Sequence, residues 1–293
     1  MLTHQKALVM AHIAAVLFGL TGIFGALISG SAEVITFGRA LFAVMGLLVI
    51  LYWQRKPIIK GISRFKGAML LLSGALLALH WVTFFIAVKI GGVAIATLGF
   101  ASFPAFIALT DWLVFKDRIT QREWLLLLLV SLGLVLVTPE FNLQDAGTIG
   151  LLWGLLSGFS FGLLAVVNKR GVQGVDAMQV AFWQNMVVML LVMPFAFTKL
   201  PALSELDWFY IALLGLFCTG LSHYLFVKSL VQLNARIAGM IIALEPVYAI
   251  AFAWWIFGST PTLKMIFGAA LILFAIIFAA RKSQNSESLN IDL

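Results

Sequence analysis

The sequence predicts an all-α polytopic membrane protein with ten transmembrane helices, arranged as an inverted five-plus-five repeat with both termini in the cytoplasm. Three observations lead to this prediction. Of the 293 residues, 62% are hydrophobic and only 11% are charged, and the mean hydropathy is +1.08. Apolar runs of about 20 residues, the length that crosses a bilayer core, recur along the whole chain. The two halves of the chain also resemble each other.

The apolar runs define ten predicted spans that are separated by short connections. The first span is longer than the apolar region of a secretory signal, which has roughly 7–15 residues, so we interpret it as a retained helix. The longest connection, 54–66, leaves no room for a soluble domain. The predicted spans are 7–28, 33–53, 67–88, 93–115, 123–138, 148–168, 177–198, 207–230, 236–257 and 263–280.

Lysine and arginine are distributed unevenly between alternate connections. Fifteen lie on the side that also holds both termini, whereas only Lys89, Lys199 and Lys264 lie on the other side. Cytoplasmic connections are enriched in these residues, so the distribution predicts a multi-pass protein of the cell inner (plasma) membrane with both termini cytoplasmic. The same rule accounts for the net charge of +7, and we expect no nucleic acid partner.

The internal repeat rests on three pairs of matched segments. Residues 93–115 match 235–257 at an offset of 142, which superposes Pro104 on Pro246, and two further pairs match at offsets of 143 and 145. Five helices is an odd number, so the second copy must enter the membrane in the opposite sense. The predicted units are a first repeat (1–142), a second, inverted repeat (143–282) and a polar cytoplasmic tail (283–293).

Several motifs carry a resemblance to the EamA-type transporters of the drug/metabolite transporter superfamily. They are TFGRALFAVM in the second span, FGLLAVVNK at the opening of the second half and LEPVYAIAFAWWIFGSTPTLKMIFGAALILFA at its close. The resemblance covers nearly the whole chain and implies ten helices, transport of small metabolites and export. The chain departs from the family pattern at Ser259 and Thr260, which replace an acid, and in the first span, which lacks a terminal lysine.

Polar side chains deep in the predicted spans are the strongest pointers to a site, because a charge at a helix centre costs about 2.5–3.5 kcal/mol on insertion scales. We expect Arg39 to attract a carboxylate, and Glu245 and His80 to attract an amine or to exchange a proton. The alternative for each is packing or hydrogen bonding within the bundle. The predicted cavity residues are Arg39, His80, Trp81, Trp183, Gln184, Asn185, His223, Tyr224, Glu245 and Tyr248.

Small and helix-breaking residues predict how the helices move and pack. Pro104 and Pro246 each remove a backbone donor near the middle of a span, which predicts two kinks that act as hinges. A broken helix is tolerated in lipid only against protein or a wet cavity, so both helices are expected to face a central pathway. Gly154, Gly158 and Gly162 form a smooth stripe that predicts close helix packing.

These observations predict a secondary transporter of small organic metabolites such as amino acids, which works by alternating access around a central cavity. Proton coupling through Glu245 and His80 is a separate hypothesis, and a facilitative uniporter or exchanger is its alternative. A channel or an intramembrane enzyme is disfavoured because the sequence has no carbonyl-filter motif and no HExxH, and because the five-plus-five symmetry has no evident catalytic use. We expect no cofactor and no metal. The expected partners are the lipid bilayer and a small-molecule substrate, and homodimer formation is left open.

Overall fold

The computed structural model describes residues 3–55, 57–138, 142–229, 232–233, 235–242 and 244–280. Within these ranges the chain is helical and contains no strand, so the predicted all-α fold class is confirmed for this part of the chain. The predicted tail 283–293 lies outside the described residues.

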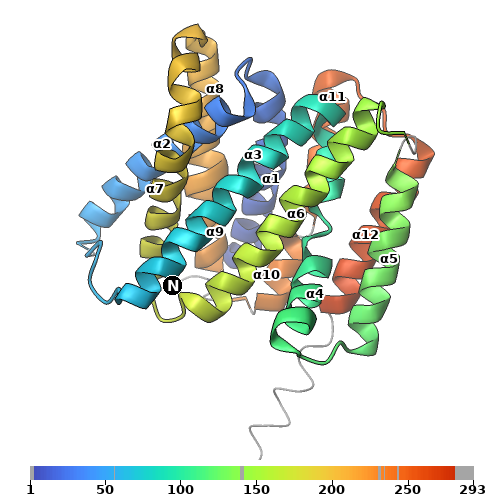
Figure 1. Cartoon of the computed structure of the whole chain (residues 1–293), viewed down its shortest axis with the longest axis horizontal. Coiled ribbons are helices and arrows are strands. Elements are labelled where there is room, and N and C mark those ends of the chain that lie inside the picture. Colours follow the sequence, from blue (N-terminus) through green and yellow to red (C-terminus); the bar gives the residue numbers. More distant parts are fainter. Residues whose placement is uncertain are drawn as a thin grey trace, which may run out of the picture.

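The described helices form one bundle (Figure 1). The helices are α1 (His4–Leu27), α2 (Ala32–Trp53), α3 (Arg64–Phe100), α4 (Phe103–Phe115), α5 (Gln121–Val137), α6 (Ala146–Gly171), α7 (Ala177–Ala196), α8 (Glu205–Gly215), α9 (Ser222–Ser229), α10 (Ala235–Ile242), α11 (Glu245–Phe257) and α12 (Leu263–Ala280). A 3-10 turn, Phe197–Ala202, follows α7, and a π-helical turn, Leu216–Leu221, joins α8 to α9.

Six of the described helices are long and apolar enough to cross a membrane, judged by length and composition. They are His4–Leu27, Ala32–Trp53, Arg64–Phe100, Ala146–Gly171, Ala177–Ala202 and Glu205–Phe226. Four further apolar helices are shorter: Phe103–Phe115, Glu123–Val137, Glu245–Phe257 and Leu263–Phe278. The structure therefore gives six long and four shorter apolar helices where the sequence predicts ten spans, and the ten-helix count stays a prediction.

Two of the predicted spans are divided into two helices at a proline. In 93–115 the helix is interrupted at 101–102, and α4 starts with Pro104 in its first turn. In 236–257, α11 likewise starts with Pro246 in its first turn. Proline lacks the amide hydrogen that an inner helical turn requires, but it fits the first turn, where the amides have no intrahelical acceptor.

Another break separates the predicted spans 67–88 and 93–115, which are joined without a loop inside α3. Gly92 adopts φ 82° and ψ 167° there, a conformation that side chains with a Cβ rarely adopt. The chain therefore turns at Gly92, and Arg64–Phe100 consists of two helical segments that meet at this kink.

Helix α6 packs closely against α3 and α4 through its glycines. A Cβ on Gly154 would lie 3.0 Å from a backbone oxygen of α3, and one on Gly158 would lie 2.6 Å from Ser102 Oγ. A Cβ on Gly162 would lie 3.0 Å from a side chain of α4. The predicted packing role of this glycine stripe is confirmed, because larger residues would push the helices apart.

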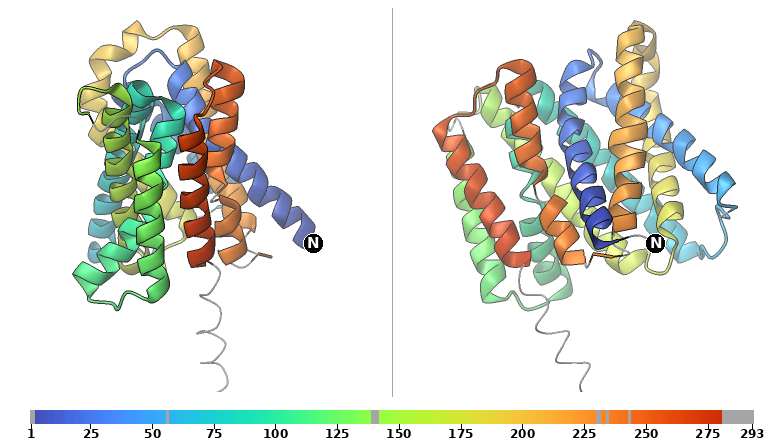
Figure 2. Two further views of the ribbon diagram at one scale, coloured as in Figure 1. Left: turned by 90° about the vertical axis from the view of Figure 1, so that its right-hand side faces the viewer. Right: turned by 180° about the vertical axis from the view of Figure 1, so that it is seen from behind.

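The contacts between the first and second halves of the bundle come in pairs. Helix α6 packs against α4 as α1 packs against α11, while α2 contacts α7 and α5 contacts α12. Figure 2 shows α5 and α12 side by side at one edge of the bundle. The division into inverted repeats 1–142 and 143–282 stays a prediction.

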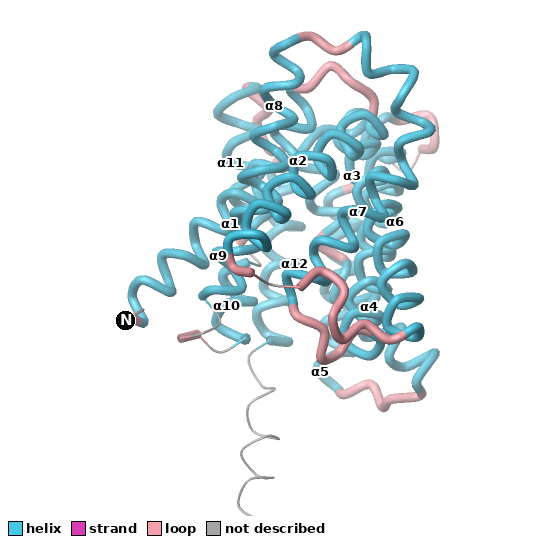
Figure 3. Tube along the Cα trace, turned by 90° about the vertical axis from the view of Figure 1, so that its left-hand side faces the viewer, coloured by secondary structure: helices cyan, strands magenta, loops and turns pink. Residues whose placement is uncertain are grey.

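The described loops gather at the two ends of the helices (Figure 3). The described residues of the basic connection (54–55 and 57–63) and the connection 116–120 lie with the N-terminal end at the bottom of Figure 1, which we call the basic end. The connection 28–31 lies at the top, which we call the opposite end.

The opposite end is held by polar contacts between segments that are far apart in the sequence. The Ser29 amide donates to Asp207 Oδ1 at 2.6 Å, and Lys199 Nζ lies 3.0 Å from Glu33 Oε1. Lys89 donates to a backbone oxygen at the end of α1. Asp207 also forms the capping box of α8, so one buried carboxylate joins the start of α8 to the α1–α2 connection.

Candidate functional site

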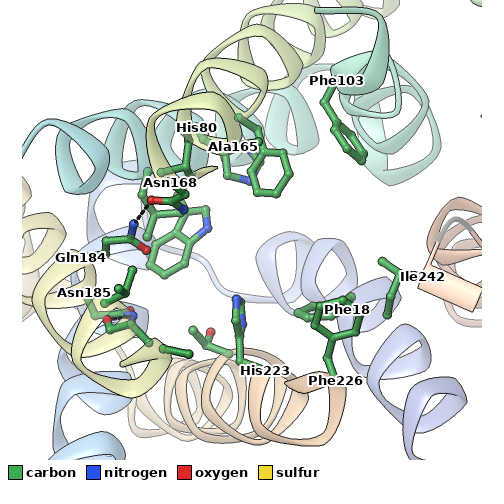
Figure 4. A pocket seen from close by; sticks show the side chains of 18 of the residues that line it. Phe18, His80, Phe103, Ala165, Asn168, Gln184, Asn185, His223, Phe226 and Ile242 are labelled. Carbon is green, nitrogen blue, oxygen red and sulfur yellow. Dashed lines mark hydrogen bonds between the residues drawn. The ribbon is translucent and has the colours of Figure 1, made fainter. Parts of the chain in front are cut away.

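A cavity of about 710 Å³ lies between helices of both halves (Figure 4). Its walls come from α1, α2, α3, α6, α7, α9, α10 and α12, from the π-helical turn, and from the two helices with a proline in their first turn, α4 and α11. The cavity reaches residues 172–175 and so extends toward the basic end. Its size is within the range of roughly 300–1,000 Å³ that is typical of sites for small organic ligands.

Arg39 places a cation in the wall of this cavity. Its side chain is only 4% exposed, and its Nε–H donates to Thr219 Oγ1 at 2.6 Å. The guanidinium carbon lies 3.9 Å from the ring centroid of Trp81, a cation–π contact. Among the described residues no hydrogen bond uses the two terminal nitrogens of Arg39, so these remain available to a ligand.

The π-helical turn explains how Thr219 reaches Arg39. Thr219 Oγ1 donates to the carbonyl oxygen of Leu214, five residues earlier, at 3.0 Å. The same oxygen, Thr219 Oγ1, accepts the hydrogen bond from Arg39 Nε. Single π-helical turns occur often at functional sites, because they re-aim one side chain without ending the helix.

Glu245 contributes an acid to the same cavity. It is the first residue of α11 and directly precedes Pro246, so it lies at a helix N-terminus, where a carboxylate is favoured by the helix dipole. Glu245 and Arg39 do not form an ion pair within 4.0 Å. Of the alternatives in which Glu245 is bonded within the bundle, the structure therefore does not show the one with Arg39 as the partner.

His80 is held by Ser157 within an aromatic wall. Its Nδ1 lies 2.7 Å from Ser157 Oγ and 3.2 Å from the Ser157 carbonyl oxygen, and Ser157 Oγ donates back to the His80 carbonyl at 3.1 Å. Because a carbonyl oxygen only accepts, the neutral ring carries its proton on Nδ1 and leaves Nε2 as an acceptor. The ring centroid lies 4.9 Å from those of both Phe100 and Phe161.

Three amide side chains form the polar part of the α6–α7 wall. Gln184 Nε2 donates to Asn168 Oδ1 at 2.8 Å and to Ser73 Oγ at 2.9 Å, which fixes Gln184 between α6 and α3. Asn185 donates to the Ala181 carbonyl, and its Oδ1 is buried without a partner among the described residues. An unpaired buried acceptor is costly, so this oxygen is a weak point in the packing of the wall.

The structure brings together seven of the ten predicted cavity residues. Arg39, His80, Trp81, Gln184, Asn185, His223 and Glu245 all line the cavity. His223 lies edge-on to Phe18, with ring centroids 5.5 Å apart. Glu245 and Phe103, which the 142-residue offset superposes, stand at equivalent positions of the two walls.

The structure places the other three predicted residues outside the cavity lining. Trp183 Nε1 donates to the Ile58 carbonyl at 3.0 Å, Tyr224 accepts from Lys228, and Tyr248 lies 3.3 Å from His12 Nδ1. Trp183 and Tyr224 each adjoin a lining residue in the sequence. Successive helical residues point about 100° apart, so their neighbours face the cavity and they do not.

Several lining residues were not predicted from the sequence. They are Phe18, Phe100, Phe103, Phe161, Asn168 and Thr219. The phenylalanines cannot be distinguished from ordinary apolar residues of a span, whereas Asn168 and Thr219 carried a signal as polar residues within apolar helices. Among the described residues no group of three His, Cys, Asp or Glu side chains is arranged to hold a metal ion.

Comparisons with known proteins agree over nearly the whole chain. Residues 5–138 and 148–281 match the model of a family described as the EamA-like transporter family. An uncharacterized transporter YwfM of Bacillus subtilis (strain 168) is 25% identical, over 94% of this chain and 95% of that protein. An S-adenosylmethionine uptake transporter of Rickettsia prowazekii (strain Madrid E) is 24% identical, over 86% of this chain and 85% of that protein.

The fold is also found among solved structures. A structure described only as "Crystal structure of protein" superposes with a TM-score of 0.64, covering 98% of this chain and 99% of the other. Its sequence is 13% identical, so the match shows a shared fold alone.

Proposed function

This chain belongs to the EamA-like transporter family, and from that premise we propose that it is a secondary transporter of a small organic molecule. It works by alternating access around the central cavity and is not an enzyme. The relatives named as transporters support the general role, and the cavity supports the kind of substrate.

The observation that carries the proposal is a pair of opposite charges in an otherwise apolar cavity. Arg39 and Glu245 both line the cavity and are not paired with each other. Charged side chains in membrane spans are expensive and face the bundle interior or a wet cavity, where they mark substrate or ion pathways. Arg39 and Glu245 together suit a ligand that carries a carboxylate, which would bind Arg39, and an amine, which would bind Glu245.

The remaining walls suggest the rest of the substrate. The ring centroids of Phe100 and Phe103 lie 5.2 Å apart, and those of Phe103 and Phe161 lie 5.1 Å apart, so the α4 side offers a continuous aromatic surface. Amino acids with apolar side chains match this arrangement. S-adenosylmethionine also has an amino-acid head and a planar base, and since some relatives bear the name of its uptake transporters, it belongs among the first probes.

Alternating access requires a cavity that opens at one end at a time. In this structure the cavity reaches the basic end, while the opposite end is held by the Ser29–Asp207 and Lys199–Glu33 contacts. We propose that the basic end faces the cytoplasm of the inner membrane, as the positive-inside rule predicts. The breaks before Pro104 and Pro246 are the proposed hinges.

Export follows from the family resemblance, whereas relatives named for uptake of S-adenosylmethionine point the other way. The direction is measured by loading the substrate on one side of oriented vesicles. A C-terminal reporter fusion that is active only in the cytoplasm checks the orientation, and a reporter that is active only outside would contradict it.

The test begins with the purified protein and a library of amino acids and related compounds, S-adenosylmethionine included. A compound that binds the native state raises its apparent melting temperature. Uptake of that compound into proteoliposomes is then measured with and without an imposed pH gradient. We expect the gradient to drive accumulation, with Glu245 as the proton site.

The variants Glu245→Gln and Glu205→Gln form a matched pair. Glu205 is an exposed acid at the start of α8, outside the cavity. Glu245→Gln is expected to abolish accumulation, whereas Glu205→Gln keeps it. Full accumulation and an unchanged pH response in Glu245→Gln would remove Glu245 from its assigned role. Flux that never exceeds the substrate gradient identifies a facilitative carrier, and unitary currents in a planar bilayer identify a channel.

A further inference from the structure

The connection between α2 and α3 is fixed to α7 rather than loose. Gln179 Nε2 donates to the carbonyl oxygens of Pro57 at 2.6 Å and of Lys60 at 3.2 Å, and Trp183 Nε1 donates to that of Ile58. Gln179 is a buried residue on α7. These three hydrogen bonds give the 57–60 segment a defined shape at the basic end, and they use the side chain of Trp183, which does not line the central cavity.

Next to this segment lies a second cavity of about 530 Å³. It is lined by Leu48, Leu51, Tyr52, Arg55 and Ile58, and it shares only the α2 helix, and none of its lining residues, with the central cavity. Four of the five side chains are apolar or aromatic, and Arg55 supplies the one charge. The second cavity, which is open to the surface, is therefore amphipathic, because its lining is apolar or aromatic except for Arg55.

The surroundings of the second cavity resemble a membrane interface. Tyr52 and Trp53 end α2 and are 81% and 79% exposed, and Ile59 in the fixed segment is 69% exposed. Aromatic residues at the end of a span are typical of the level of the lipid headgroups. Leu48, one turn further along α2 toward the bilayer core, is also exposed, so an acyl chain can lie along it.

The charge of this region is of one sign. The sequence 54–66 contains five Lys and Arg residues and no acid. Arg55 adopts a left-handed backbone conformation (φ 51°) just after α2, and among the described residues its side chain forms no ion pair. A guanidinium binds a phosphate through two parallel hydrogen bonds, and basic pockets on the cytoplasmic side of membrane proteins attract anionic headgroups.

We propose that the second cavity binds one anionic phospholipid. The phosphate lies at Arg55, the headgroup lies over the 57–60 segment, and an acyl chain runs along the exposed side chain of Leu48. Gln179 and Trp183 are positioning residues, because they hold the segment through its carbonyl oxygens. This site is separate from the proposed substrate cavity and does not depend on what the protein transports.

The test compares two basic residues that share their local structure. Lys116 also follows a helix at the basic end in a left-handed conformation (φ 57°), but it does not line the second cavity. The purified full-length protein and the variants Arg55→Gln and Lys116→Gln are titrated with phosphatidylglycerol in detergent. Binding is followed by lipid retention in native mass spectrometry and by the rise in melting temperature.

One basic residue near a membrane surface contributes about 1 kcal/mol to attraction of anionic lipid, which corresponds to about a fivefold change in affinity. We therefore expect Arg55→Gln to bind phosphatidylglycerol about fivefold more weakly and Lys116→Gln to bind it like the unmodified protein. Trp183→Phe, which keeps the ring and loses the Ile58 hydrogen bond, is expected to weaken binding less than Arg55→Gln.

Three results would overturn the proposal. Equal lipid retention by Arg55→Gln and Lys116→Gln would show that the charge of Arg55 does not contribute to lipid binding. If the unmodified protein bound phosphatidylcholine as tightly as phosphatidylglycerol, the site would be an acyl-chain groove that does not select the headgroup. An identical melting shift with inorganic phosphate alone would show a site for a soluble anion rather than a lipid.

Discussion

The two helix breaks before Pro104 and Pro246 have the same backbone design and different chemistry. In both, a proline occupies the first turn of a 13-residue helix that points its start into the central cavity. The residue before the proline is Phe103 in one break and Glu245 in the other. Phe103 belongs to an aromatic wall with Phe100 and Phe161, whereas Glu245 is an acid at a helix N-terminus.

The difference separates two requirements of a transporter. The proline breaks both helices where they meet the cavity, and a break of this kind needs only a missing backbone donor. Recognition needs one wall that binds charge and another that binds apolar surface. A symmetric pair of breaks with asymmetric side chains meets both requirements, because the backbone stays matched while one side chain changes.

Replacing Glu245 with phenylalanine makes the two breaks alike and is expected to have the largest effect on function. The amine partner is lost, so transport of a zwitterionic substrate should fall by about 100-fold, which corresponds to the loss of a charge-assisted contact of roughly 2–3 kcal/mol. The protein should remain folded, because an apolar residue replaces a partly buried acid. Flux and melting temperature are measured together. Intact flux, or unfolding without the variant reaching the membrane, would contradict this interpretation of the asymmetry.

The reverse change, Phe103→Glu, tests the aromatic wall. A carboxylate would stand among Phe100, Phe161 and His80 without a cation within the wall, so we expect a loss of about 2–4 kcal/mol of stability. Phe103→Leu serves as the control, since it keeps an apolar side chain and should cost less. The measurement is the melting temperature in detergent, and a variant as stable as the control would show that water in the cavity already solvates this position.

The sequence predicted the charged wall better than the aromatic wall. Arg39, His80 and Glu245 are exceptional in apolar helices, so their cost alone indicates a site. Phe103 and Phe161 look like any other apolar residue of a span, and only the tertiary arrangement separates lining from packing residues. The helix breaks were predicted from proline chemistry. Trp183 was wrongly predicted to line the cavity, because composition does not determine which face of a helix points toward it.

Ser157→Ala sharpens the role of His80 in the aromatic wall. The change removes the hydroxyl that contacts His80 Nδ1, so the ring loses part of what fixes its tautomer, and we expect about a tenfold rise in substrate KM, equivalent to roughly 1.4 kcal/mol. Ser160→Ala is the matched control. Ser160 lies on the same helix and bonds only backbone oxygens of α6, so its loss should leave KM unchanged. An equal effect of the two variants would assign Ser157 to packing alone.

The smallest effect is expected for Tyr248→Phe, one turn after Glu245. The 142-residue offset superposes Tyr248 on Phe106, so this variant makes the second turns of the two helices alike while leaving Glu245 in place. Tyr248 does not line the cavity, and among the described residues its hydroxyl has one hydrogen-bonding contact, with His12 Nδ1 at 3.3 Å. We expect unchanged transport and a loss of at most about 1 kcal/mol of stability. A strong loss of transport here, with Glu245 intact, would mean that the asymmetry of the two breaks extends beyond the residue before the proline and reaches the contact between α11 and α1.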